Sequence, residues 1–85
     1  MIEMKEAMVL VERELARTGK IHPNPFSSAH EGISVIREEY LELEKEVFWG
    51  NKHQGIHSVN MRTEAVQLAA MAVRFLADVC NTRKL

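Results

Sequence analysis

The sequence predicts an all-α fold, in which a three-helix subunit with antiparallel core helices oligomerises into a helical bundle. Three long stretches lack proline and together hold one glycine: residues 2–18, 28–49 and 60–82. Residues 19–25 contain both prolines, and residues 50–55 contain two glycines. Because proline and glycine interrupt helices, this punctuation indicates three helices joined by two loops.

The first predicted helix has one apolar stripe, formed by Met4, Met8, Val11 and Leu15 at helical spacing. We expect this stripe to face the core and the helix to stop at Gly19, since glycine is common at helix C-termini.

The second predicted helix has a clear start, because Ser28 followed by Glu31 fits a capping box. Gly32 in the first turn lowers the local helix propensity but does not break the helix. The apolar positions alternate in steps of three and four, which is typical of bundle packing: Ile33, Ile36, Tyr40, Leu43 and Val47.

The third predicted helix begins near Asn60, a suitable N-cap, and is apolar on two opposite sides. One side carries Val66, Ala69, Ala70, Val73, Leu76, Ala77 and Cys80, and the other carries Leu68, Met71 and Phe75. A helix that is apolar nearly all round is buried nearly all round, so we place it at a subunit interface. In the alternative, a monomer, the first helix covers one side and the second helix the other.

Length and composition set the class of protein. A chain of 85 residues that is 46% apolar makes one small domain, residues 1–85, whose core alone is marginal. The single cysteine, Cys80, excludes an intrachain disulfide, and we expect it to lie in the core. The remaining sources of stability are a metal, a partner chain, or both.

The charge pattern argues against several partners. A net charge of -1 provides no field for nucleic acid or anionic lipid, and no apolar run approaches the roughly 20 residues of a membrane span. Acids stand near the N-terminus where a signal peptide would be basic. We therefore expect a cytoplasmic protein with a reduced thiol and neither nucleic-acid nor membrane partners.

The second helix carries five glutamates between residues 38 and 46. Such a run is usually a solvated face, but Glu39, Glu42 and Glu46 border the apolar seam. Like charges one turn apart repel unless a cation is present. Glu39 and Glu42 can both reach one hard divalent ion, and carboxylate oxygens suit Mg²⁺ or Mn²⁺.

Glu64 heads the apolar face of the third helix, with Gln67 one turn later. Antiparallel packing would bring Glu64 toward the glutamates of the second helix. Taken alone, Glu64 is better explained as an acid that complements the positive end of the helix dipole.

Two motifs resemble those of a known family. Glu38-Glu39-Tyr40-Leu41-Glu42 matches the EExxE motif of the MazG-like all-α NTP pyrophosphohydrolases, and Glu64-Ala65-Val66-Gln67 stands where that family has ExxD. The resemblance covers roughly residues 28–78 and is nearest to the short phage and bacterial members.

The resemblance implies a function. Such proteins hydrolyse nucleoside triphosphates to monophosphate and pyrophosphate with Mg²⁺, in some cases to clean the nucleotide pool, and they assemble as homodimers or homotetramers. By position, Glu39, Glu42 and Glu64 would be metal ligands. Glu38 would be a further ligand or would orient the attacking water, so that Glu38 and Glu39 are the catalytic candidates.

Gln67 departs from the family motif, since its amide can coordinate a cation or touch substrate but brings no charge. Lys52 and Arg62, in or beside the second loop, are candidates for binding phosphate near the start of the third helix. Two alternatives remain open: a non-catalytic oligomer of the same fold that acts as a nucleotide sensor or assembly module, and a helical adaptor whose glutamates are surface charge.

Overall fold

The computed structural model describes residues 1–50 and 56–80. It contains α1 (Met4–Ile21), α2 (Ala29–Trp49) and α3 (Ile56–Asp78). Within the described residues every regular element is a helix and no strand occurs. The all-α class and the three predicted helices are confirmed.

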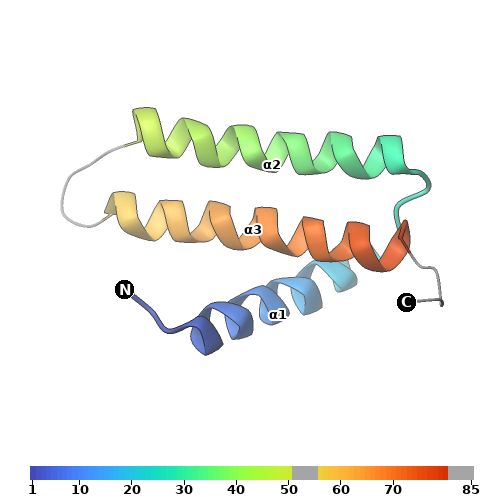
Figure 1. The fold of residues 1–85 in the computed structure, drawn as a ribbon, viewed down its shortest axis with the longest axis horizontal. Helices are drawn as coiled ribbons and strands as arrows, with labels where there is room; N and C mark the ends of the chain where they lie inside the picture. The colour runs from blue at the N-terminus through green and yellow to red at the C-terminus, as the bar shows by residue number, and fades with distance from the viewer. Residues whose placement is uncertain (51–55, 81–85) are drawn as a thin grey trace.

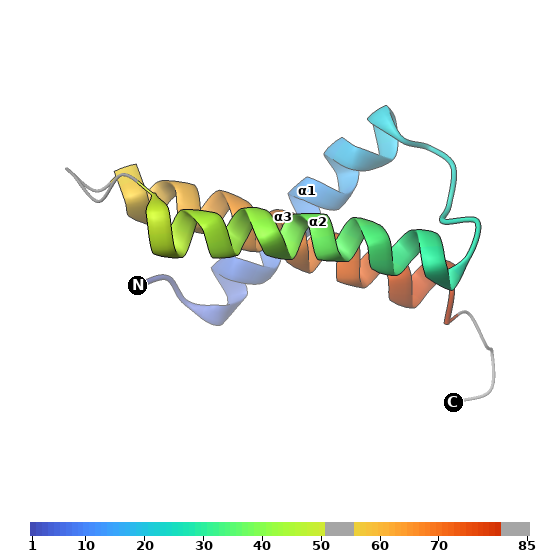
Figure 2. The same cartoon turned by 90° about the horizontal axis from the view of Figure 1, so that it is seen from above.

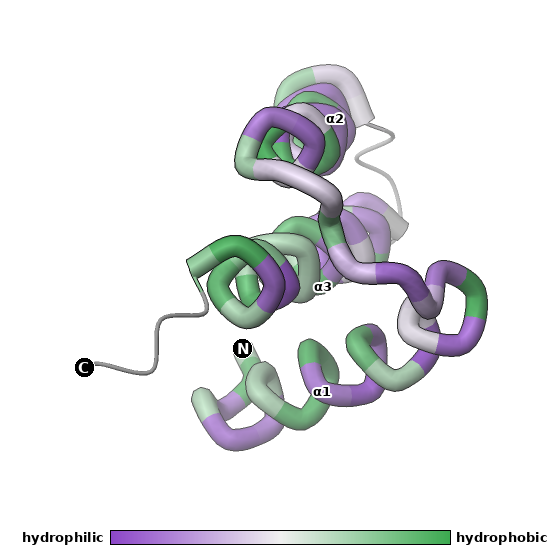
Figure 3. The backbone as a smooth tube through the Cα atoms, turned by 90° about the vertical axis from the view of Figure 1, so that its right-hand side faces the viewer, coloured by the Kyte–Doolittle hydropathy of each residue, from purple (hydrophilic) through white to green (hydrophobic). Residues whose placement is uncertain are grey.

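α3 is the central element (Figure 1). It packs against α2 on one side and α1 on the other, while α1 and α2 do not pack against each other. α2 lies along the length of α3, whereas α1 crosses it obliquely (Figure 2). The view along the helices shows the same order, with α3 between its two neighbours (Figure 3). α3 therefore contacts one helix on each of two sides, but Val73 and Leu76 on the same helix stay exposed.

The register of α2 against α3 follows from contacts at both ends of the pair. Gly32, at the start of α2, lies against Phe75, near the end of α3. Glu46, near the end of α2, lies 3.4 Å from His57 at the start of α3, measured from Oε1 to Nδ1. The middle of α2 consequently lies beside the first half of α3.

The start of α2 is capped as predicted. The Ser28 hydroxyl accepts a hydrogen bond from the Glu31 backbone N–H at 3.1 Å. The Glu31 carboxylate reaches back to accept from the N–H of Ser27 at 2.9 Å, one residue before the cap. Two donors that the helix itself cannot satisfy are thereby paired.

Gly32 is buried because α3 comes close at this point. A Cβ atom added there would lie 2.5 Å from Cδ2 of Phe75 and 3.2 Å from Cδ2 of Phe26. The sequence marks this glycine as a weak point in the helix. In the structure it is the residue that leaves room for two aromatic rings.

Two helix ends differ from the prediction. α1 continues through Gly19 to Ile21, and the N–H of His22 closes the last turn on the carbonyl of Thr18 at 2.7 Å. α3 begins at Ile56, so Asn60 lies inside the helix and is not its N-cap. A glycine or a capping residue only biases a helix end by about 1 kcal/mol, which hydrogen bonding and packing can outweigh.

The core is thin. Among the described residues only Ala70, Met71 and Thr18 are classed as buried besides Gly32. Cys80, two residues after the end of α3, is exposed, so the expectation of a core cysteine is wrong. Many large apolar side chains on α2 and α3 remain exposed, namely Ile33, Tyr40, Leu41, Val47, Phe48, Trp49, Val59, Val73 and Leu76.

None of the described helices has both the length and the apolar character needed to span a bilayer.

The segment between α1 and α2 is held by the end of α3. The Asp78 carboxylate accepts a hydrogen bond from the N–H of Phe26 at 3.0 Å. Nη2 of Arg74 donates to the carbonyls of His22 at 3.3 Å and Asn24 at 2.8 Å. The Arg74 guanidinium also lies over the Phe26 ring, 5.1 Å from its centroid. These contacts fix the segment as a wall beside the helix pair.

Candidate metal centre and adjoining hollow

Three carboxylates gather where α2 passes the first half of α3. Glu39, Glu42 and Glu64 each place a carboxylate oxygen within 4.8 Å of the other two. Glu39 and Glu42 are one helical turn apart on α2, and the register described above brings Glu64 beside them. The structure thus brings together the three residues that the sequence analysis selected as metal ligands.

The electrostatic environment disfavours the anionic form of two of them. Partial burial, followed by the nearby charges of Glu42 and Glu64, raises the pKa of Glu39 from 4.5 to about 7. Burial and the close approach of Glu42 also raise the pKa of Glu64. Like charges that share a site resist joint ionisation, so the cluster favours either a bound proton or a bound cation.

Two oxygens of the cluster lack partners. Oε2 of Glu39 and Oε2 of Glu64 are buried and accept no hydrogen bond. In the described part of the chain, none of the three glutamates forms an ion pair with a lysine, arginine or histidine. Oxygen ligands and net negative charge are what hard divalent cations such as Mg²⁺ and Mn²⁺ bind in proteins. The residues present therefore fit a cation of this kind.

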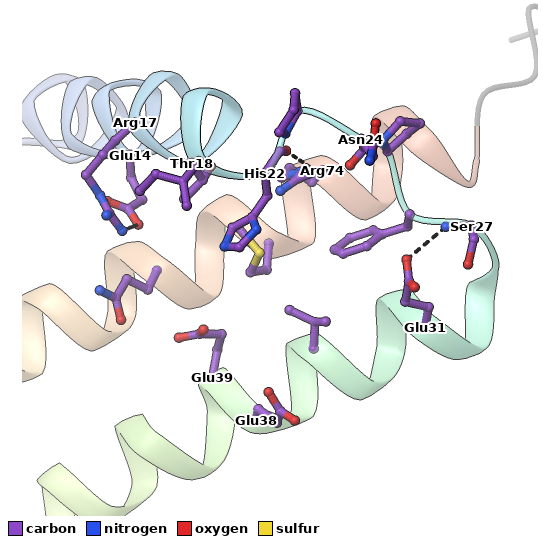
Figure 4. Close-up of a pocket in the computed structure, with 17 residues that line it drawn as sticks. Glu14, Arg17, Thr18, His22, Asn24, Ser27, Glu31, Glu38, Glu39 and Arg74 are labelled. Atoms are coloured by element: carbon purple, nitrogen blue, oxygen red, sulfur yellow. Dashed lines mark hydrogen bonds and ion pairs between the residues drawn. The ribbon is translucent and has the colours of Figure 1, made fainter.

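A hollow of about 850 Å³ adjoins the cluster (Figure 4). Its walls come from the second half of α1, the segment that follows it, the first half of α2, and α3. Glu38 and Glu39 lie on the α2 wall, and Gln67 lies on the α3 wall. Glu38 is exposed, whereas Gln67 is half-buried. The structure therefore places both residues where a ligand in the hollow would meet them.

The remaining candidates lie elsewhere. Arg62 is exposed and lines a separate hollow of about 330 Å³ with residues from the start to the middle of α1, among them Lys5 and Arg13. It is not brought to the hollow that Glu39 lines. Lys52 lies outside the described residues.

The sequence analysis missed one pair in the hollow. Arg17 on α1 donates from Nε to Oε1 of Glu14 at 2.9 Å and from Nη2 to Oε2 at 2.6 Å. The hydrogen bonds from Arg17 lower the pKa of Glu14. The available signal was two opposite charges three residues apart, next to the apolar position Leu15. That signal is common in helices, and nothing in it locates the pair beside α2.

Arg74 and Asp78 lie one turn apart on α3, with Nε of Arg74 4.0 Å from a carboxylate oxygen of Asp78. Their side chains also hold the segment before α2, and Arg74 lines the hollow. The site as a whole joins a cluster of three carboxylates to a hollow that is lined by two arginines, Arg17 and Arg74. Comparison with models of protein families finds no match, and neither does comparison with curated proteins or with solved structures.

Proposed function

We propose that this protein is a divalent-metal-dependent nucleoside triphosphate pyrophosphohydrolase that releases a nucleoside monophosphate and pyrophosphate. The observation that carries the proposal is the convergence of Glu39, Glu42 and Glu64 from two helices, with two buried oxygens that lack partners. The resemblance of both glutamate motifs to those of MazG-like enzymes supports the reaction type. A role in clearing the cytoplasmic nucleotide pool agrees with that resemblance.

The proposed roles follow from position. Glu39, Glu42 and Glu64, whose carboxylate oxygens converge, would hold Mg²⁺ or Mn²⁺. A divalent cation there neutralises phosphate charge and favours attack by water. Glu38 lines the hollow next to Glu39 and is exposed, so its carboxylate can accept a hydrogen bond from the attacking water.

The hollow supports a ligand of nucleotide size. Small-molecule sites usually have volumes of roughly 300–1,000 Å³, and the hollow of about 850 Å³ falls within that range. Glu39 belongs both to the cluster and to the wall of the hollow, so a triphosphate bound in the hollow would lie next to a cation held by the cluster.

The proposal includes an antiparallel core pair that associates with further copies as a homodimer or homotetramer. Support comes from the thin core and from the exposed apolar side chains on α2 and α3, including Tyr40, Trp49 and Leu76. Burial of apolar surface drives association. Light scattering at micromolar concentration should give a multiple of the 9.7 kDa subunit mass. A mass near that of one subunit would refute this part.

The direct test is release of pyrophosphate from a panel of standard and modified nucleoside triphosphates with Mg²⁺ or Mn²⁺. We expect turnover of at least one substrate, which stops on chelation of the metal. Absence of turnover for the whole panel, together with absence of a metal-dependent rise in melting temperature, would reject the proposal.

Matched variants assign the activity to the cluster. Glu39→Gln and Glu64→Gln should each lower kcat/KM by about 100-fold or more, because an amide keeps the shape but loses the charge that binds the cation. Glu44→Gln is the control, since Glu44 lies on the same helix and only accepts a hydrogen bond from the Tyr40 hydroxyl at 3.0 Å. Equal losses in all three variants would mean that the cluster has no special role.

Gln67 supports a second candidate, a nucleotide sensor that binds without hydrolysis. This side chain stands in the wall of the hollow with Glu39, where the resembled motif has a carboxylate. Under the sensor hypothesis the wild-type protein binds metal and nucleotide without turnover, and Gln67→Asp creates or raises activity. Under the enzyme hypothesis the wild-type protein already turns over.

A further inference from the structure

The hollow beside the carboxylate cluster is lined by more acids than cations. Glu14, Glu31, Glu38 and Glu39 face Arg17 and Arg74 there. A polyphosphate anion entering this space meets repulsion from the acids that are ionised. It therefore needs positive charge from the protein in addition to a divalent metal.

Arg74 is already engaged with the backbone. Its Nη2 donates to the carbonyls of His22 and Asn24, and its guanidinium covers the Phe26 ring. The Arg74 side chain is 14% exposed and also lies 4.0 Å from the carboxylate of Asp78. If Arg74 left these contacts, the segment before α2 would lose the hydrogen bonds that hold it. Arg74 therefore has a structural role.

Arg17 differs in every one of these respects. Its side chain is 55% exposed, and it donates two hydrogen bonds to one side chain, that of Glu14. Figure 4 shows both side chains reaching from α1 into the space above Glu39. The charge of Glu14 is close enough to contribute to the raised pKa of Glu39. The pair thus lines the same hollow as Glu39.

The geometry of the pair matches that of arginine bound to phosphate. Two parallel N–H groups of the guanidinium point at two oxygens of one carboxylate, 2.9 Å and 2.6 Å away. Two oxygens of a phosphoryl group have nearly the same arrangement, and arginine binds both kinds of anion in this way. Glu14 therefore holds Arg17 in an orientation suited to a phosphoryl group.

We propose that Arg17 is a phosphate-binding residue of this site, which exchanges Glu14 for two oxygens of the polyphosphate when the ligand enters the hollow. This inference rests on the proposed function. The exchange removes the attraction between Arg17 and Glu14, and the positive charge of the incoming metal compensates the released carboxylate. No covalent bond forms or breaks in the exchange.

A simpler role for the pair predicts something different. Exposed ion pairs three residues apart stabilise a helix only slightly. If that were the only role, loss of Arg17 would lower helix stability slightly and leave anion binding unchanged.

The test compares Arg17→Ala with Arg13→Ala, which removes the same charge one turn earlier on α1, at the other hollow. We measure KM for the best triphosphate of the panel and the inhibition constant of pyrophosphate, both with Mg²⁺. Arg17→Ala should raise both by roughly 10- to 100-fold, the range for loss of a charged hydrogen-bonding partner, and Arg17→Lys should recover part of the loss. Arg13→Ala should match the wild type, and Mg²⁺ affinity without nucleotide should not weaken in any variant.

Equal constants for Arg17→Ala and Arg13→Ala would overturn the inference while leaving the proposed function intact. Lack of turnover by the wild type would instead refute the proposed function. In that case calorimetric binding of pyrophosphate with Mg²⁺ decides: weaker binding by Arg17→Ala supports the inference, and equal or absent binding overturns it. If circular dichroism shows that Arg17→Ala is unfolded, Arg17→Lys and Arg17→Gln replace it in the same comparison.

Discussion

Glu39 of α2 and Glu64 of α3 come from positions 25 residues apart in the chain, yet they bring carboxylate oxygens to within 4.8 Å of each other. Each has one buried oxygen without a hydrogen-bond partner. Each also has a raised pKa, for which burial is the largest cause. The two helices therefore hold together two groups that repel when ionised. Because of this repulsion, the stability of the fold should depend on pH and on bound cations.

The metal-free protein should lose stability as pH rises from about 4.5 to about 7. The folded pKa of Glu39, about 7, lies above its ordinary value of 4.5, so the folded state holds the proton more tightly. This contribution is fully present below the ordinary pKa and is lost as pH rises through the folded pKa. Urea unfolding with a chelator across this range measures it.

Glu39→Gln is the reference for that experiment, because the amide does not titrate. The difference in free energy of unfolding between wild type and variant should change with pH in the direction given above. Parallel pH profiles for the two proteins would show that Glu39 titrates normally.

Mg²⁺ should restore the stability that the metal-free protein loses as pH rises. A cation that binds only the folded state stabilises it, by about 2.7 kcal/mol at one hundred times the dissociation constant. Because protons compete for the same oxygens, the rise in melting temperature should be larger near pH 8 than near pH 5. Thermal melts of wild type, Glu64→Gln and the control Glu44→Gln measure this. A rise of equal size in Glu64→Gln would place the bound Mg²⁺ elsewhere.

Gly32→Ala should destabilise the protein by about 1 kcal/mol. The new methyl group would lie 2.5 Å from the Phe75 ring, and such overpacking costs about 1–3 kcal/mol, offset in part by about 1 kcal/mol of helix propensity. Gly19→Ala is the matched control, since nothing lies within 4 Å of its Cβ position. It should stabilise the protein by about 0.5–1 kcal/mol. Stabilisation of both variants in urea titrations would contradict the close approach of α2 and α3.

Asp78→Ala should weaken the attachment of the segment before α2 to the end of α3. The N–H of Phe26 loses its acceptor, which costs about 1–2 kcal/mol, and Arg74 loses a neighbouring charge. Amide hydrogen exchange at Phe26 should become faster, while exchange within the middle of α2 changes less. Asp78→Asn keeps an acceptor oxygen and should show a smaller effect. Unchanged exchange at Phe26 in Asp78→Ala would show that another contact holds this segment.

Local features of this fold could be predicted from the sequence because they depend on neighbouring residues. Helices follow from the stretches without proline, and the start of α2 follows from Ser28 and Glu31. The carboxylate motif was visible because Glu39 and Glu42 are one turn apart, and helical geometry alone places them together. Helix ends were less certain, as Gly19 and Asn60 show, because a local preference of about 1 kcal/mol does not decide an end.

By itself, the sequence determined the helices, one cap and the two glutamate motifs, since each of these is a matter of a few adjacent turns. Only the tertiary structure decided that α1 crosses α3 so that Arg17 and Glu14 reach the hollow beside Glu39. It also decided that Arg74 and Asp78 hold the preceding segment and do not simply pair along their helix. These relationships join residues up to 52 positions apart, and they depend on how helices pack, which periodicity along the chain does not encode.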